Sequence, residues 1–183
     1  MLPFFIKAMS LAFTEFPLMN INVNPETDEA GYIKEYVIKE DHNIAVAIDS
    51  PHGLVVPVIK KCQEKSILDI NQAILDSRDK AYSGKLTAAD FEGGSFTVSS
   101  VGNLGGKYFV PTILRPQGGI CAIGKSNKTP KWNEVTESFE PKDIINFSYT
   151  CDHRVIDGAT CAQFSERVRQ LIEDPHKMLL TMN

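Results

Sequence analysis

Several common features are missing from this chain of 183 residues. None of its four cysteines belongs to a Cys-x-x-Cys pair, which disfavours a disulfide framework and a structural zinc site, and we interpret all four as free, buried thiols. The longest apolar stretches are broken by Pro, Lys or Asp well before they reach a membrane-spanning length. The net charge is only −4, and no face rich in Lys and Arg stands out. We therefore expect no membrane, no nucleic acid and no metal as a partner.

Sequence motifs of several well-known active sites are absent as well. No Gly-x-Ser-x-Gly occurs, so the nucleophile elbow typical of serine hydrolases is missing. Gly102, Gly105 and Gly106 follow a strand-like segment, but no Gly-Lys-Ser/Thr comes after them, and their spacing is not the dinucleotide-binding fingerprint. The stretch 102–106 is predicted to be a tight turn. Contact with a phosphate or cofactor, through Ser100 and Gly102, is the alternative.

The composition is that of an ordinary globular domain. Hydrophobic residues make up 43% of the chain and charged residues 23%, which is enough apolar material for a hydrophobic core. Neither an internal repeat nor an internal boundary is visible. Residues 1–183 are therefore predicted to form a single domain.

Hydrophobic periodicity predicts helices interspersed among many strands. A proline in the first turn and apolar residues at helical spacing indicate a buried helix over 3–16, and Ser66 with Asp69 indicates the capped start of a second helix. A third helix follows Gly158, and 87–90 forms a short turn. Strands are predicted over 19–23, 32–38, 43–49, 53–59, 95–101, 119–124 and 144–150, with 53–59 a single buried strand. Because several strands are too close in sequence for crossovers, the fold class is α/β (α+β), a mixed β-sheet covered by helices.

The most informative segment is Asp-His-Arg-Val-Ile-Asp-Gly-Ala, residues 152–159. It joins a strand to the third helix, an arrangement that holds a loop on a rigid frame. His153 carries the side chain that exchanges protons near neutral pH, so it is a candidate general base. Asp157 can support that base directly or brace the loop, where its charge is opposite to that of Arg154. Cys151 offers an alternative Cys–His nucleophile, provided that the strand continues through the motif.

A second candidate segment is the strand over 95–101, which ends in two adjacent hydroxyl groups. A rigid hydroxyl at the right position can donate a hydrogen bond to an oxyanion. Ser99 and Ser100 are both candidates for this role.

These two segments resemble motifs of a known family, the catalytic domains of dihydrolipoamide acyltransferases, which are the E2 cores of 2-oxo acid dehydrogenase complexes. Residues 152–159 resemble the family's terminal motif, and Ser-Phe-Thr-Val-Ser over 95–99 resembles its second motif. The resemblance runs from Leu2 to the C-terminus and implies a fold similar to that of chloramphenicol acetyltransferase. Within the family the branched-chain enzyme is most similar, on the segments 2–8, 16–20 and 155–160 and on Gly105-Gly106 with Pro111.

The resemblance implies an activity and a role for each candidate residue. A branched-chain acyl group moves between a dihydrolipoyl thioester and coenzyme A, which is a substrate, and the lipoyl group is carried on a separate domain. His153 is the general base on the thiol of coenzyme A, Ser99 binds the oxyanion, and Asp157 is structural through an arginine partner. The reaction that the resemblance implies is a direct transfer, which requires no metal and no protein nucleophile.

The resemblance also implies an assembly. The active site lies between subunits of a trimer, so that His153 faces Ser99 of the neighbouring chain. Trimers associate into a cubic 24-subunit core, with a dodecahedral 60-subunit core as the alternative. The implied partners are the lipoyl domain and, through other domains, the E1 and E3 components. The implied location is the mitochondrial matrix, or the cytoplasm in a bacterium.

The chain departs from the family pattern in two respects. Ser100 stands where the family commonly has asparagine. The family's domain is expected to begin roughly fifty residues before Leu2, so that its first helix and strand, the arginine partner of Asp157, and the lipoyl and subunit-binding domains lie outside these residues.

Three alternative functions remain: the acetyl-transferring E2 of the pyruvate complex, a Ser-His-Asp hydrolase, and a catalytically silent core subunit that only assembles and docks partners.

Overall fold

The computed structural model, which describes residues 1–102 and 104–181, is built on a mixed six-stranded sheet. The strand order is β10-β7-β6-β3-β4, and β5 also pairs with β3. The two central pairings, β3 with β6 and β6 with β7, are parallel, whereas β10 and β4 pair antiparallel at the two edges. The bounds are β3 Ile44–Ser50, β4 Gly53–Val55, β5 Val58–Ile59, β6 Phe96–Ser100, β7 Gly119–Ile123 and β10 Phe147–Cys151. The predicted mixed sheet is confirmed.

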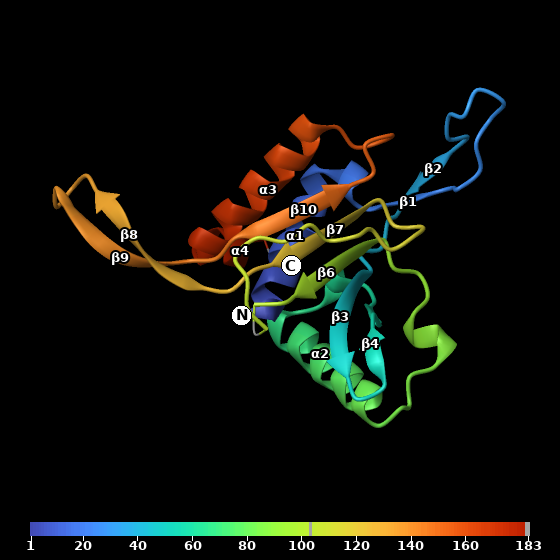
Figure 1. Cartoon of the computed structure of the whole chain (residues 1–183), viewed down its shortest axis with the longest axis horizontal. Coiled ribbons are helices and arrows are strands. Elements are labelled where there is room, and N and C mark those ends of the chain that lie inside the picture. Colours follow the sequence, from blue (N-terminus) through green and yellow to red (C-terminus); the bar gives the residue numbers. More distant parts are fainter. Residues whose placement is uncertain (103, 182–183) are drawn as a thin grey trace.

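Three long helices cover one face of this sheet, and α1 lies between the other two (Figure 1). The bounds are α1 Leu2–Glu15, α2 Ile67–Tyr82, α3 Gly158–Glu173 and the short α4 Pro175–Thr181, with 3-10 turns at Pro17–Met19, Cys62–Glu64 and Ala88–Asp90. Even Lys7 of α1 is buried, and its ammonium donates to the carbonyl oxygens of Cys62, Gln63 and Lys65 at 3.3, 3.1 and 2.8 Å. These acceptors replace the water that burial removes from the charge. The predicted buried helix is confirmed.

The start of α2 follows the local sequence. Ser66 Oγ accepts a hydrogen bond from the backbone N–H of Asp69 at 3.1 Å, and Asp69 Oδ2 accepts one from the backbone N–H of Ser66 at 3.0 Å. This reciprocal pair is a capping box, which satisfies two N–H groups that the helix leaves without partners. The predicted cap is confirmed.

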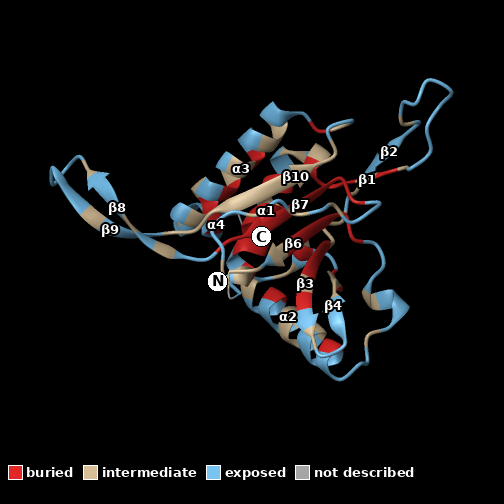
Figure 2. Cartoon of the chain, in the orientation of Figure 1, coloured by how far each residue is buried: buried red, intermediate tan, exposed pale blue. Residues whose placement is uncertain are grey.

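An aromatic cluster joins the helices to the sheet. The rings of Phe13 on α1 and Phe164 on α3 stack with centroids 5.4 Å apart and planes 9° apart, and Phe96 of β6 meets Phe13 edge-on at 5.4 Å. All three side chains are buried, and Figure 2 shows the buried residues concentrated on α1 and on the central strands β7, β6 and β3. Tyr149 of β10 meets Phe164 edge-on with centroids 5.8 Å apart, so this cluster contacts both elements that the His153 loop connects.

The prediction of one buried strand over 53–59 is wrong. The segment runs back along β3 in two pieces, β4 and β5, which are separated at Val56 and Pro57. Pro57 has no N–H to donate, and β4 lies at the sheet edge, where Leu54 is 71% exposed. An apolar run alone does not distinguish an edge strand from a central one.

Two hairpin arms project from the body in Figure 1. One pairs β1 Ile21–Val23 with β2 Tyr36–Ile38, within segments predicted to be strands. The other, β8 Asn127–Asn133 with β9 Ser138–Ile144, has no counterpart in the sequence prediction, and the predicted strand 144–150 begins too early because Ile144 ends β9. Since neither face of this second arm is buried, its strands lack the apolar alternation by which strands are recognised.

Among the described residues, no helix combines the length and the apolar character that crossing a membrane requires.

Candidate active site

The loop that carries His153 is fixed at both ends. The backbone N–H of Asp152 donates to the carbonyl oxygen of Gly118 at 2.8 Å, and the carbonyl oxygen of Asp152 accepts from the N–H groups of Val155 and Ile156 at 3.1 and 2.9 Å. The Ile156 side chain is buried in the core. A tight turn therefore presents His153, whose side chain is exposed, at the end of β10.

An ion pair flanks His153 on both sides in sequence. The Arg154 guanidinium donates to both carboxylate oxygens of Asp152, from Nε at 2.9 Å and from a terminal nitrogen at 2.6 Å. These hydrogen bonds lower the pKa of the Asp152 carboxyl group. A bidentate pair fixes orientation as well as distance. Arg154 therefore pairs with Asp152, and the opposite charges of Arg154 and Asp157 do not form an ion pair with each other.

Asp157 is the N-cap of α3. Its carboxylate accepts a hydrogen bond from the backbone N–H of Thr160 at 2.7 Å, and this bond, together with one from the Thr160 side chain, lowers the pKa of Asp157. The charge of nearby His153 makes the smallest contribution to the same lowering. Asp157 thus braces the loop at the point where the helix begins.

A cavity of about 850 Å³ opens beside the loop. His153 lines it together with Gln117, Arg115 and Thr150, and the remaining walls include the apolar residues Val23, Pro25, Pro111, Ile113 and Pro116. Gln117 is buried and accepts a very short hydrogen bond from the Thr97 hydroxyl of β6. The sequence analysis does not identify Arg115, Gln117 or Thr97 as site residues, because no local pattern distinguishes a loop residue that folds against a distant strand.

Ser99 and Ser100 lie on opposite faces of β6, because side chains alternate along a strand. Phe96 and Val98 point into the core with the helices, so Ser100 shares their face, whereas Ser99 shares the face of Thr97. Ser99 is therefore on the same side of the sheet as the hydroxyl that contacts the cavity residue Gln117. Neither serine lines the cavity beside His153.

A single chain keeps Ser99 and His153 apart. Ser99 pairs with Ala122 of the neighbouring strand β7, and Ala122 in turn pairs with Ser148 of β10. From Ser148 the chain runs along β10 to Cys151, about 10 Å at 3.3 Å per residue, before it turns at the His153 loop. The two residues are at opposite ends of the sheet, as the opposed arrows of β6 and β10 show in Figure 1.

The glycine-rich stretch after β6 is a turn, as predicted. The N–H of Leu104 donates to the carbonyl oxygen of Val101 at 3.0 Å, and Gly105 and Gly106 have φ of 125° and 80°, values that L side chains rarely adopt. Gly102 packs closely on the backbone of Gly124. Asn103 lies outside the described residues.

The thiol of Cys151 is hydrogen-bonded to the sulfur of Cys161 and not to His153. Cys151 is the last residue of β10, and its sulfur lies 3.5 Å from that of Cys161. The alternative of a Cys–His nucleophile required the strand to continue through the motif, and the strand does not. All four cysteines are free; Cys62 and Cys121 are buried as predicted, whereas Cys151 and Cys161 are only half-buried. Within the described part of the chain, no group of three or more His, Cys, Asp or Glu side chains is placed to hold a metal ion.

The fold is similar to that of chloramphenicol acetyltransferase. A solved chloramphenicol acetyltransferase matches 92% of this chain with a TM-score of 0.58 at 15% identity, a likeness of fold alone. The chain belongs to the family of 2-oxoacid dehydrogenase acyltransferases, whose catalytic-domain pattern matches residues 1–180. The predicted family and fold are confirmed.

Relatives within the family carry two different names. A mitochondrial lipoamide acyltransferase component of the branched-chain alpha-keto acid dehydrogenase complex, from Caenorhabditis elegans, is 40% identical over 97% of this chain and 38% of its own length. A dihydrolipoyllysine-residue acetyltransferase component of the pyruvate dehydrogenase complex, from Cupriavidus necator, is also 40% identical, over 98% of this chain and 31% of its own length. The chain thus spans less than two-fifths of these relatives.

Solved structures agree closely with this fold. The cubic core of a pyruvate dehydrogenase multienzyme complex matches with a TM-score of 0.88 and 34% identity, over 97% of this chain and 70% of the other. The dihydrolipoamide acetyltransferase of Azotobacter vinelandii matches with the same TM-score at 33% identity, with the same coverage of both chains. In that protein a serine, a histidine and an asparagine four positions after the histidine have been examined for their role in the catalytic mechanism.

Proposed function

We propose that this chain transfers an acyl group between an S-acyl dihydrolipoyl thioester and coenzyme A. The observation that carries the proposal is the placement of His153, which is exposed on a braced loop and lines a cavity of about 850 Å³. Ligand cavities typically have volumes of about 300–1,000 Å³ and combine apolar walls with a few polar groups. Prolines and Ile113 supply the apolar walls, and Gln117 and Arg115 the polar groups, which fits an extended thiol-bearing arm with amide groups.

Each candidate residue has one task in the proposed reaction. His153 accepts the proton of the coenzyme A thiol as its sulfur bonds to the thioester carbonyl carbon. Ser99, from a neighbouring chain, donates a hydrogen bond to the carbonyl oxygen as negative charge develops there. His153 then returns the proton to the dihydrolipoyl sulfur as the old carbon–sulfur bond breaks. The acyl group moves directly from one sulfur to the other.

Asp157 serves this reaction by positioning the loop. Asp157 lies four positions after His153, and its carboxylate caps α3 by accepting a hydrogen bond from the N–H of Thr160. In the Azotobacter vinelandii protein an asparagine stands at the same spacing after a histidine, and an amide oxygen can cap a helix as a carboxylate does. The shared property of the two side chains is a hydrogen-bond acceptor, and the negative charge is not required for the cap.

The proposed active site is shared between chains. Ser99 and His153 occupy opposite ends of the sheet, so the serine and the base of one site come from two subunits of a trimer. A related acetyltransferase forms the cubic core of a pyruvate dehydrogenase complex, which supports a cubic 24-subunit assembly for this chain. The lipoyl domain and the E1 and E3 components are then its partners, and the mitochondrial matrix, or a bacterial cytoplasm, is its location.

Branched-chain acyl groups are the proposed substrate class. The first three curated relatives act in branched-chain complexes, the Caenorhabditis elegans protein among them. Acetyl transfer is the second candidate, because the Cupriavidus necator acetyltransferase is equally identical to this chain.

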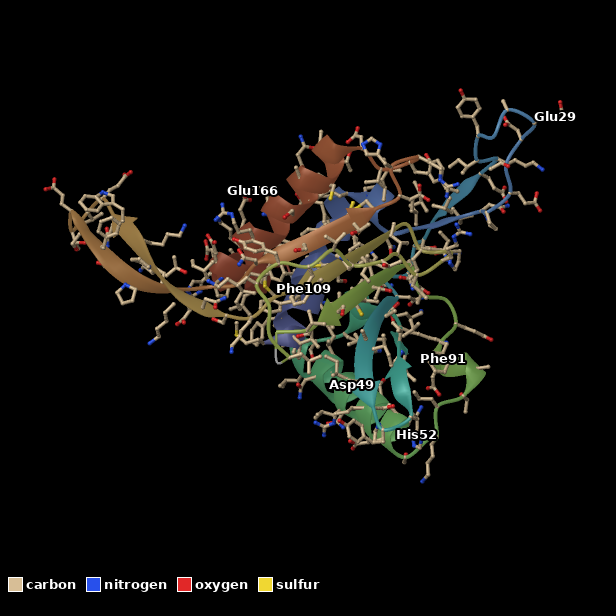
Figure 3. The ribbon with its side chains drawn as sticks, in the orientation of Figure 1. Glu29, Asp49, His52, Phe91, Phe109 and Glu166 are labelled. Carbon is tan, nitrogen blue, oxygen red and sulfur yellow. The ribbon has the colours of Figure 1, made fainter. Side chains whose placement is uncertain are left out.

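The experiment that tests the proposal compares isobutyryl-CoA with acetyl-CoA as donors to free dihydrolipoamide, on protein whose assembly has been verified. We expect preferential isobutyryl transfer and a loss on the order of 10²- to 10⁴-fold in His153→Ala. His52→Ala is the matched control, since His52 is exposed at the turn between β3 and β4 (Figure 3). An assembled protein without transfer would contradict the proposal and favour a silent core subunit. Transfer that His153→Ala leaves unchanged would contradict the role assigned to His153. A stable acyl-serine would favour the hydrolase instead.

A further inference from the structure

Two thiols lie opposite each other at the two ends of the His153 loop. Cys151 is the last residue of β10, and Cys161 lies in the first turn of α3. The Cys151 thiol donates to the Cys161 sulfur, and the two sulfur atoms are 3.5 Å apart although the residues are ten positions apart in sequence. Both side chains are half-buried and therefore partly accessible to solvent, whereas Cys62 and Cys121 are fully buried.

We propose that Cys151 and Cys161 form an oxidisable dithiol, which closes to an intramolecular disulfide when it meets a small-molecule disulfide, and that closure slows acyl transfer by displacing His153. Formation of the disulfide is independent of the proposed function. Its effect on transfer rests on that function.

The electrostatics assign different roles to the two sulfurs. The hydrogen bond from the Cys151 thiol lowers the pKa of Cys161 to about 7, against the opposing effect of burial. The same hydrogen bond and burial raise the pKa of Cys151. The first turn of a helix further favours a negative charge at Cys161. Cys161 is therefore the attacking thiolate, and Cys151 is the thiol that resolves the intermediate.

The reaction proceeds in two exchange steps. The Cys161 thiolate attacks one sulfur of a disulfide RSSR, forms a mixed disulfide and releases RS⁻, which takes up a proton. Cys151 then loses its proton and attacks the Cys161 sulfur, and the second RS⁻ leaves as RSH once protonated. Two cysteine thiols are oxidised to one disulfide, and one RSSR is reduced to two RSH, so atoms and electrons balance.

Closure moves the loop that carries His153. A disulfide bond is about 2.05 Å long, so the two sulfurs must approach each other by more than 1 Å from their present separation of 3.5 Å. Cys151 is held in β10 and Cys161 in α3, and the segment between them is the part of the chain that contains His153. A misplacement of about 1 Å at a reacting group can cost on the order of 10²-fold in rate.

The first test detects the disulfide by mass. The whole chain is incubated with glutathione disulfide, its remaining thiols are alkylated, and it is digested with trypsin without reduction. Arg154 lies between the two cysteines, so cleavage places them in separate peptides, 143–154 and 155–167, which stay joined only by the proposed bond. We expect this joined pair. Glutathione retained on Cys161 alone, or no reaction, would overturn the proposal.

Variants separate the two steps and the functional effect. Cys151→Ser should retain glutathione on Cys161, Cys161→Ser should retain none on Cys151, and the control Cys62→Ala should close as the wild type does. Oxidised wild type should transfer acyl groups at least tenfold more slowly than the reduced protein and recover with dithiothreitol. Equal transfer in both states would overturn the regulatory part. A protein that forms the disulfide but transfers no acyl group in either state would contradict the proposed function, and the proposal of an oxidisable dithiol would still hold.

Discussion

Ser99 and His153 lie at opposite ends of one sheet: Ser99 and Ser148 both pair with Ala122 of β7, whereas His153 follows the far end of β10, past Cys151. No rotation of either side chain closes a gap of that size. If both residues act on one thioester, they must come from different chains. Under the proposed function, assembly is therefore a condition of activity.

The bidentate pair between Arg154 and Asp152 is expected to orient His153. Arg154→Ala should lower kcat by roughly tenfold or more, because the loop loses its bidentate ion pair. The free energy of unfolding should fall by about 1–3 kcal/mol, because the mostly buried Asp152 carboxylate loses its donor. Steady-state kinetics and chemical denaturation measure the two effects. Arg169→Ala is the matched control, since Arg169 makes a similar fork with Glu166 on α3 (Figure 3). Equal kinetics in the two variants would exclude a positioning role for Arg154.

Asp157 is expected to act through its hydrogen bond and not through its charge. Asp157→Ala should lose about 1 kcal/mol of stability together with activity, because Thr160 N–H loses its acceptor. Asp157→Asn should keep most of both. Unfolding curves and transfer rates measure the effects, with Ser66→Ala, which removes the cap of α2, as a control that loses stability alone. An inactive but stable Asp157→Asn protein would show that the charge itself is needed.

The stacked rings of Phe13 and Phe164 are expected to hold α1 and α3 against the sheet. Phe164→Ala should cost about 3–5 kcal/mol in the free energy of unfolding, because a fully buried ring is replaced by a cavity. Urea denaturation measures the loss. Phe91→Ala, at an exposed ring in the segment before β6 (Figure 3), should cost clearly less. Similar losses at the two positions would contradict the assigned core.

His42 is expected to make stability depend on pH. Burial, and next the charge of Lys7, lower its pKa in the folded chain, while Asp41 acts in the opposite direction. Because the unfolded chain then binds the proton more tightly, the contribution of His42 is fully present above about pH 6.5 and is lost as the pH falls through the folded pKa. His42→Gln should therefore lose less stability than the wild type between pH 7.5 and 5, measured by denaturation at each pH. Parallel losses in the two proteins would refute the assignment.

Much of the fold could be predicted because local patterns determine it. Ser66 with Asp69 marked a helix start, and the alternating residues of β6 and β10 marked strands. The β8–β9 hairpin was missed because it buries neither face, and 53–59 was assigned wrongly because an edge strand interrupted at Pro57 has the same apolar composition as a central one.

The candidate site could be predicted only in part. The loop of His153 was located by its position between a strand and a helix. The ion pair in this loop is not predictable in the same way: Arg154 lies two positions from Asp152 and three from Asp157, and only the fold decides which carboxylate it contacts. Gln117 and Arg115 reach the cavity from a loop without periodicity, and sequence spacing gives no measure of such distant contacts.

The most direct measurement is complementation between two inactive chains. Ser99→Ala and His153→Ala chains, carrying different tags, are expressed separately and together, and transfer to dihydrolipoamide is measured on assemblies that contain both tags. If each site takes His153 from one subunit and Ser99 from the next, every trimer that contains both chains has one intact site in three, so about a third of wild-type activity should return in mixed trimers and about a quarter in an unselected equal mixture. Activity no greater than that of the two separate variants would mean that the site is not shared between chains.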